Sequence, residues 1–447
     1  MKRKLSMLAA LILSLGVFTA CGSNQEADQG ADAPSQEVEE SQTEGEDKEE
    51  VSEEPSEEED QANEAEAIEV VFWHAMGGGQ GEALEKLTQQ FEEENPNITI
   101  NLQNKGGYGD LNQALVASMQ SPKDLPIITQ AYPDWMLQFD NAGMVADLTD
   151  FVKGEDGIED YEDIFPGIRE EIEQDGRIIG IPFNKSTEVF WYNKDLFEEL
   201  GLEVPTSYEE LKEVSQKIYE EKGIPGVGFD SLSNYYVTYL KNKGVEFDGS
   251  LDITSPESVE AVNYYNDGVK EGYFRIAGTD QYMSGPFANE QAGAYIGSNA
   301  GEVYIKEGVE DKFTYAAAPY PAENAFQQGT NIYMFDKASD EEKAAAFKYL
   351  KFLQSKDAQI QFALDTGYMP ARKSSVEDEA YQSSDSSIAP ILSEASEKLF
   401  SRPLVEGSQQ AYNDIGSLLE SILSNKDADV KAELEAFAPQ FESDFAQ

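Results

Sequence analysis

The chain has 447 residues, with 32 Lys and Arg against 87 Asp and Glu, so its formal net charge is −55. The length predicts two or three domains, and a chain this acidic lacks the basic surface that nucleic acids and anionic membranes attract. Its single cysteine, Cys21, and single histidine, His74, exclude an internal disulfide, a Cys-based or multi-His zinc site and an iron–sulfur cluster. No cofactor and no metal are expected.

Residues 1–21 are typical of a lipoprotein signal peptide. A basic start precedes the apolar stretch 5–17, which is too short to span a bilayer. The letters FTACG at 18–22 resemble the lipobox of bacterial lipoproteins, in which the chain is cut before the cysteine and a lipid is attached to its sulfur; Phe18 stands where Leu is usual. We therefore expect lipidation of Cys21, as by palmitate. The alternative is an ordinary secretory signal with an incidental cysteine.

Residues 22–67 predict a disordered acidic linker. They contain 19 acidic residues, one lysine and no aromatic residue. Such a segment cannot bury enough apolar surface to offset the entropy of ordering. It would hold a folded domain away from a membrane.

The folded part begins at Ile68 and alternates strands with helices, which is the pattern of an α/β fold. The glycine-rich turn after the first strand fits neither a dinucleotide-binding fingerprint nor a P-loop. Strands are predicted at 68–73, 98–102, 127–132, 178–183, 189–192, 292–297 and 314–318. Helices are predicted around 84–91, 111–119, 208–219, 256–266 and 343–353, with a tail helix that places Val430, Leu434, Phe437 and Phe441 on one face.

Four motifs carry a resemblance to a known family. They are FWH at 72–74 with the following Met-Gly turn, FEEENP at 91–96, PFNKST at 182–187 running into WYNKDLF at 191–197, and TGYMP at 366–370. Together they resemble the family 1 extracellular solute-binding proteins of ABC importers, and within that family the branch of the glycerol-3-phosphate-binding protein.

The resemblance implies an α/β, two-lobe clamp like that of the periplasmic binding proteins (type II), whose lobes are joined by hinge segments. It assigns 68–185 with 318–373 to lobe 1 and 186–317 with 374–447 to lobe 2. The implied partners are a solute and the transmembrane subunits of an ABC permease, with no nucleic acid. The protein is expected to be a monomer on the extracellular face of a Gram-positive cell membrane, attached only through the lipid on Cys21.

Seven residues are candidates for ligand binding. The resemblance implies ligand contacts for Tyr108, Ser186, Ser298, Tyr368 and Arg402. Gly329 joins them because a glycine lets a backbone N–H approach the ligand, and Asp134 because it could accept two sugar hydroxyls. Each has a structural alternative: Asp134 as a helix N-cap, Ser298 in a turn that serves only the backbone, and Arg402 in a surface ion pair are the clearest. His74 is expected to be structural.

The solute is predicted to be a carbohydrate. In the glycerol-3-phosphate branch a ligand-contacting Glu follows the Tyr that matches Tyr132, whereas this chain has Pro133 there and an acid one residue later. The new acid at Asp134 favours a neutral oligosaccharide. Glycerol-3-phosphate or a glycerophosphodiester is the alternative, with Arg402, Lys185 and Lys105 as candidate cations for phosphate. A lipid-anchored glycosidase is the remote alternative, since so acidic a chain always offers paired carboxylates; otherwise no enzymatic activity is expected.

Overall fold

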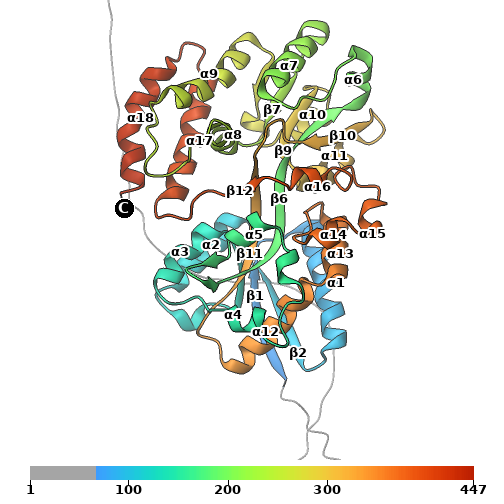
Figure 1. The fold of residues 1–447 in the computed structure, drawn as a ribbon, viewed down its shortest axis with the longest axis vertical. Coiled ribbons are helices and arrows are strands. Elements are labelled where there is room, and N and C mark those ends of the chain that lie inside the picture. Colours follow the sequence, from blue (N-terminus) through green and yellow to red (C-terminus); the bar gives the residue numbers. More distant parts are fainter. Residues whose placement is uncertain (1–66, 447) are drawn as a thin grey trace, which may run out of the picture. The chain divides into compact units, whose positions relative to one another are not determined.

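The computed structural model describes residues 67–446. The predicted signal peptide, the lipidation site Cys21 and almost all of the predicted acidic linker lie outside these residues. Strands and helices alternate along the described chain, as the sequence predicts (Figure 1).

Ten strands join in one hydrogen-bonded sheet, whose main path runs in the order β2-β1-β3-β11-β6-β9-β7-β8. β10 also pairs with β6, β12 pairs with β11, and β4 and β5 form a separate two-stranded sheet. The strand bounds are β1 Ile68–His74, β2 Ile98–Asn104, β3 Ile128–Ala131, β4 Glu173–Gln174, β5 Arg177–Ile178, β6 Ile181–Asn193, β7 Val227–Phe229, β8 Phe274–Ile276, β9 Ala294–Ser298, β10 Tyr315–Pro319, β11 Ala325–Met334 and β12 Leu399–Phe400.

Eighteen α-helices are formed within residues 67–446. In chain order they are α1 Gly78–Glu94, α2 Tyr108–Ser118, α3 Pro133–Asn141, α4 Thr149–Lys153, α5 Pro166–Glu170, α6 Lys194–Leu200, α7 Tyr208–Lys222, α8 Leu232–Asn242, α9 Pro256–Glu271, α10 Ser284–Ala288, α11 Glu302–Val309, α12 Asp340–Leu353, α13 Lys356–Thr366, α14 Lys373–Val376, α15 Glu379–Gln382, α16 Leu392–Ala395, α17 Ser408–Ser424 and α18 Val430–Asp444. Within the same residues, no helix is long and apolar enough to cross a membrane.

Local sequence explains the first strand–helix–strand unit. The apolar residues of α1 recur at helical spacing, and Leu84, Leu87 and Phe91 are all buried. The helix ends at Asn95, immediately before Pro96, which resists continuing a helix. β2 then pairs in parallel with β1 along its whole length, as a crossover helix between two strands requires.

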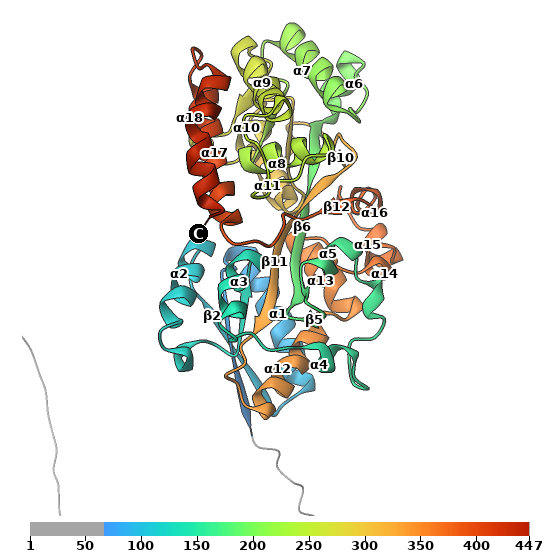
Figure 2. The same cartoon turned by 60° about the vertical axis from the view of Figure 1, so that its left-hand side comes forward.

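Strand β6 links two halves of the sheet. Its first part, Ile181 to Thr187, pairs with β11, and its second part, from Glu188 onward, pairs with β9 and β10. We call the strands β1 to β3 with helices α1 to α4, α12 and α13 the β1 half. We call β7 to β9 with α6 to α11, α17 and α18 the β7 half. β6 and β11 run between the two halves in both views (Figures 1 and 2).

The hydrophobic cores correspond only in part to the β1 half and the β7 half. One core packs α7, α8, α9, α17 and α18 against the β7 half, and it includes Val430, Leu434 and Phe441 of the predicted tail-helix face. The largest core begins in the β1 half but continues to Tyr295 and Ile305 of the other half. The described chain is therefore one compact unit. The short helices α14 and α15 contact α13 of the β1 half, whereas α16 contacts β10, which pairs with the second part of β6. The lobe boundaries stay a prediction.

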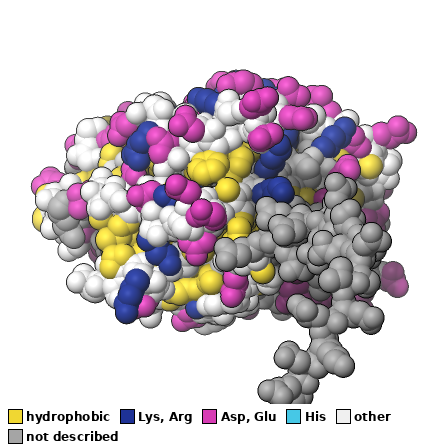
Figure 3. All heavy atoms as spheres, turned by 90° about the horizontal axis from the view of Figure 1, so that it is seen from below, with side chains coloured by type: hydrophobic (Ala, Val, Ile, Leu, Met, Phe, Trp, Pro, Cys, Tyr) yellow, Lys and Arg dark blue, Asp and Glu magenta, His cyan; other side chains and the backbone are white. Residues whose placement is uncertain are grey.

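The surface carries the acidity predicted from composition. On the face shown in Figure 3, acidic side chains are spread widely, with lysines and arginines among them. Several of these cations form exposed ion pairs, such as Lys86 with Asp365 at 2.9 Å and Lys217 with Glu221 at 2.5 Å. Exposed pairs of this kind contribute little to stability.

Candidate functional site

A cavity of about 780 Å³ lies among the strand ends of both halves. Tyr108 begins α2 directly after β2, and Asp134 lies in the first turn of α3 directly after β3. From the other half, Ser298 ends β9 and Asp230 follows β7. Ligands of open α/β sheets bind outside the carboxyl ends of the strands, and the volume is within the usual range of small-molecule sites.

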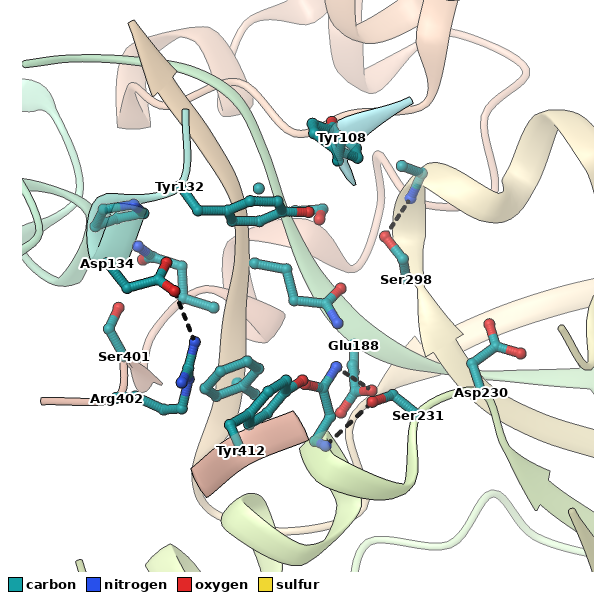
Figure 4. Close-up of a pocket in the computed structure, with 18 of the residues that line it drawn as sticks. Tyr108, Tyr132, Asp134, Glu188, Asp230, Ser231, Ser298, Ser401, Arg402 and Tyr412 are labelled. Carbon is teal, nitrogen blue, oxygen red and sulfur yellow. Dashed lines mark hydrogen bonds and ion pairs between the residues drawn. The ribbon is translucent and has the colours of Figure 1, made fainter. Parts of the chain in front are cut away.

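All seven candidate residues line this one cavity: Tyr108, Asp134, Ser186, Ser298, Gly329, Tyr368 and Arg402. They come from seven separate places in the chain, so the fold has brought them together. Their contacts with a ligand stay a prediction. Figure 4 shows Tyr108, Asp134, Ser298 and Arg402 around the cavity.

Aromatic side chains form one wall. The ring centroids of Tyr108 and Tyr132 are 5.1 Å apart, as are those of Tyr132 and Trp135. The Tyr108 hydroxyl accepts from Asn184 Nδ2 at 3.0 Å and lies 3.5 Å from the Tyr368 hydroxyl. Burial raises the pKa of Tyr108, so its phenol is neutral. This wall offers planar apolar surface with polar edges.

Arg402 lies beside Asp134 but is held mainly by other groups. Its guanidinium donates to Ser408 O at 3.1 Å and to Gln409 Oε1 at 2.8 Å, and it stacks on the Tyr412 ring with 4.1 Å to the centroid. Its nearest distance to Asp134 Oδ2 is 3.9 Å, beyond hydrogen-bond range. Arg402 is therefore fixed in place at the cavity wall by its bonds to the first residues of α17.

Asp134 keeps a free oxygen. Its Oδ2 atom is buried and has no hydrogen-bond partner in the described part of the chain. Burial raises the pKa of Asp134, and Arg402 opposes that shift. The N-cap of α3 is Tyr132, so the alternative of Asp134 as an N-cap is wrong. Asp134 is the second residue of the helix, because Pro133 occupies the first helical position that its fixed φ favours.

Two glycine and serine candidates also serve the backbone. Gly329 has φ +94°, and a Cβ there would lie 2.1 Å from Asn184 O on the neighbouring strand. The need for glycine is thus explained by strand β6 without a ligand. Ser298 Oγ accepts from the backbone N–H of Ala300 at 3.2 Å, while its hydroxyl proton remains free to donate.

Two of the three cations considered for phosphate are placed elsewhere. Lys185 is buried and pairs with Glu171 at 2.6 Å. Lys105 stacks on the Trp73 ring at 3.9 Å to the centroid and donates to Gln103. Among the described residues that line the cavity, Arg402 is the one cation. His74 is buried outside the lining, where burial lowers its pKa to about 4, as a structural histidine requires.

Glu188 and Asp230 were missed by the sequence analysis. Glu188 lies on β6, is 1% exposed, and accepts from Asn234 Nδ2 at 3.0 Å, while its Oε2 has no partner in residues 67–446. Burial raises the pKa of Glu188 to about 8 and that of Asp230 to about 7. No local signal in the sequence separates Glu188 from other acids, because it ends the polar run 184–188 and its missing cation is visible only in the folded contacts.

Two other residues that line the cavity were also missed, and the sequence contains no signal that would have identified them. Tyr132 stands beside Asp134, and Gln327 beside Gly329, but nothing in the sequence separates them from other tyrosines and glutamines. Both amide atoms of Gln327 are buried without partners in the described chain. Gln327, Glu188 and Asp134 thus combine an orphan polar atom with a place in the cavity lining, where a polar ligand would satisfy them.

No group of three or more Asp, Glu, His or Cys side chains in the described chain is arranged to hold a metal ion.

Comparisons with known proteins agree with this geometry. Residues 86–387 match the family model of the bacterial extracellular solute-binding proteins. The sn-glycerol-3-phosphate-binding periplasmic protein UgpB of Shigella flexneri serotype 5b is 26% identical over 333 residues, covering 69% of this chain and 76% of the relative. UgpB of Escherichia coli K12 is 25% identical over 333 residues, with the same coverage.

Solved structures share the fold. The GacH receptor of Streptomyces glaucescens, solved unliganded and with acarbose, has a TM-score of 0.74 at 19% identity, over 85% of this chain and 99% of that one. UgpB of Mycobacterium tuberculosis in complex with glycerophosphocholine has a TM-score of 0.73 at 22% identity, over 84% and 98%. MalE of Xanthomonas citri reaches 0.76 at 18% identity, over 85% and 97%.

The predicted α/β binding-protein fold and the predicted resemblance to the glycerol-3-phosphate-binding branch are confirmed. The family match covers well over half of the chain. The protein belongs to the bacterial extracellular solute-binding protein family.

Proposed function

We propose that this protein is the solute-binding lipoprotein of an ABC-type sugar importer, which captures a carbohydrate in the cavity and delivers it to a membrane permease. The observation that carries the proposal is the pairing of an aromatic wall with unsatisfied polar groups. The rings of Tyr108, Tyr132 and Trp135 offer apolar faces for sugar C–H groups. The orphan oxygen of Asp134 can accept a hydroxyl proton, and the protonated carboxyl group of Glu188 can donate to a hydroxyl oxygen.

Charge favours a carbohydrate over a phosphate. Four carboxyl groups line the cavity, those of Asp134, Glu171, Glu188 and Asp230, against the single lining cation Arg402. A phosphate dianion would have Arg402 as its one lining cation, and Arg402 already lies beside the carboxyl group of Asp134. Sugar hydroxyls are neutral, and they can donate to a carboxylate or accept from a protonated carboxyl group.

A phosphorylated glycerol compound is the second candidate. Arg402 supports it, because guanidinium groups bind phosphate oxygens well, and so do the names of the UgpB relatives and the glycerophosphocholine complex. In this case Arg402 would anchor the phosphate and Asp134 would have to move away or take up a proton.

A thermal-shift panel separates the two candidates. Residues 22–447, which keep every described residue, would be melted with mono- and oligosaccharides, glycerol-3-phosphate and glycerophosphodiesters. A ligand at 100 times its Kd adds about 2.7 kcal/mol to the unfolding free energy, a rise of a couple of degrees or more. A rise with a sugar is expected; a rise only with phosphorylated compounds would contradict the proposal.

The mode of capture and attachment is also proposed. The lobes 68–185 with 318–373 and 186–317 with 374–447 would close on the solute around the crossing strand β6. Cys21 would carry the lipid that attaches the monomer to the outer face of the cell membrane. Mass spectrometry of the detergent-extracted protein tests the anchor: a chain beginning at lipidated Cys21 is expected, and an unmodified Cys21 would contradict it.

The proposal also requires that the solute leave unchanged. Incubation of the responding sugar with excess protein, followed by mass analysis, should return the intact sugar. Cleaved products would instead favour a glycosidase.

A further inference from the structure

The carboxyl groups of the cavity differ in how their charges are compensated. Glu171 is bound to Lys185 at 2.6 Å, and Asp134 has Arg402 at 3.9 Å. In the described chain, neither Glu188 nor Asp230 has a lysine or arginine within 4.0 Å. Two acids that line a small-molecule cavity therefore stand without a cation supplied by the fold.

Both uncompensated acids face the cavity with one oxygen engaged. Glu188 Oε1 accepts from Asn234, which leaves the buried Oε2 as an orphan. Asp230 Oδ1 accepts from the backbone N–H of Met283 at 2.6 Å. Figure 4 shows Asp230 and Arg402 on opposite sides of the cavity, with Glu188 between them. The acids are thus separated from the one lining cation.

We propose that Glu188 and Asp230 form a subsite for a protonated amino group, so that the solute is a carbohydrate with a cationic nitrogen. The inference rests on the proposed carbohydrate function and specifies its substrate class. An ammonium group has three donors and a positive charge. The ammonium group would form a hydrogen bond with Glu188 Oε2, and its positive charge would compensate Glu188 and Asp230. A neutral hydroxyl could form the hydrogen bond but could not compensate the charge.

The proton balance follows from the surroundings of Glu188. The groups that face it are the Asn234 amide, Asp230, and the phenols of Tyr208, Tyr320 and Tyr412, none of them cationic. Burial without a cation raises the pKa of Glu188 to about 8, so the free protein holds this carboxyl protonated at neutral pH. When an ammonium group binds, the carboxyl ionises and its proton passes to solvent. Binding of a neutral sugar releases no proton here.

Matched ligands test the subsite. Oligosaccharides of glucosamine and of galactosamine would be compared with their N-acetylated counterparts of equal length, by calorimetry near pH 6.5 in buffers of different ionisation enthalpy. For the responding pair, the amine form should bind at least tenfold tighter and release between one and two protons, because Glu188 and Asp230 are both largely protonated at this pH. Equal or tighter binding of the N-acetylated form, or no proton release, would overturn the inference.

Two variants locate the effect. Glu188→Gln retains the size of the side chain and the bond from Asn234, and it should remove the amine preference and the part of the proton release that comes from Glu188. Asp230→Asn should reduce the preference in part. If Glu188→Gln failed to fold, the number of protons that the unaltered protein releases on binding the amine would still test the subsite. An amine preference that survives in folded Glu188→Gln would contradict the assignment.

The outcomes separate this inference from the proposed function. If neutral sugars bind and no amino sugar binds better, the sugar importer stands and the amine subsite falls. If only phosphorylated solutes bind, the sugar importer falls. The subsite is then judged by glycerophosphoethanolamine against glycerol-3-phosphate, where the same tenfold preference for the amine is expected and its absence overturns the inference.

Discussion

Two buried glutamates of the same cavity have opposite surroundings. Glu171 receives three contacts: Lys185 Nζ at 2.6 Å, Ser401 Oγ at 2.8 Å and Asn331 Nδ2 at 3.3 Å. Glu188 receives one, from Asn234, and no cation of the described chain pairs with it. The first acid is neutralised by the fold, so it supports the architecture. The second keeps one carboxyl oxygen, Oε2, without a hydrogen-bond partner in the described chain, so that oxygen is available to a ligand.

The largest effect should come from breaking the compensated pair. Lys185→Ala leaves Glu171 as a buried, uncompensated charge beside the Asn331 amide. We expect a loss of about 3–5 kcal/mol in the free energy of unfolding, measured by urea denaturation. The matched control is Lys86→Ala, which removes an exposed pair and should cost no more than about 1 kcal/mol. Equal losses would contradict the structural role of the Lys185 pair.

The raised pKa of Glu188 should make the free energy of unfolding depend on pH. The pKa of Glu188 is raised from 4.5 to about 8 on folding, so the folded state binds more protons than the unfolded state between these values. Stability contributed by the protonated acid is therefore lost as pH rises from about 4.5 to 8. Glu188→Gln should be more stable than the unaltered protein at pH 8, on the order of 1–4 kcal/mol, and the difference should shrink toward pH 5.

A pH-independent difference between the two proteins would show that Glu188 titrates normally. Asp230→Asn provides a second check, because the pKa of Asp230 is raised from 3.8 to about 7 and the same sign applies over that window.

Sugar binding should also depend on Asp134, the acid beside Arg402. Asp134→Ala removes an orphan oxygen that is expected to accept sugar hydroxyls, and it should weaken sugar binding by roughly 1.5–3 kcal/mol. Calorimetry with the sugar that gives the largest thermal shift measures the change. Asp134→Asn, which keeps one acceptor, should lose less. Unchanged affinity of Asp134→Ala would remove this residue from the site.

Local patterns were sufficient for most of the fold. Helical spacing located α1 and the buried face of α18, residue composition located β1, and alternation located β2. The pattern was insufficient at β6, which was predicted as two extended segments because the polar run at 184–188 interrupts its apolar residues. In the structure that run is buried and continuous, since distant partners such as Glu171 and Phe326 O satisfy it. Such partners are not visible from local sequence.

The site was predictable to a similar degree. Family motifs identified five of the candidate residues, and side-chain and backbone chemistry added Asp134 and Gly329; the fold brings all seven to one cavity. They did not identify Glu188, because its importance comes from the absence of a cation around it, which only the folded contacts reveal. They also suggested Lys185 as a cation for phosphate, although its charge is consumed by Glu171. Charge compensation is a property of the tertiary structure.

The central claim is that the cavity binds a carbohydrate whose donor group engages Glu188. A crystal structure of the protein with the sugar that gives the largest thermal shift tests it most directly. The account predicts a sugar ring packed on the Tyr108–Tyr132 wall and a ligand donor within hydrogen-bond distance of Glu188 Oε2. A ligand bound outside the cavity, or a bound sugar that leaves Glu188 Oε2 without a partner, would contradict it.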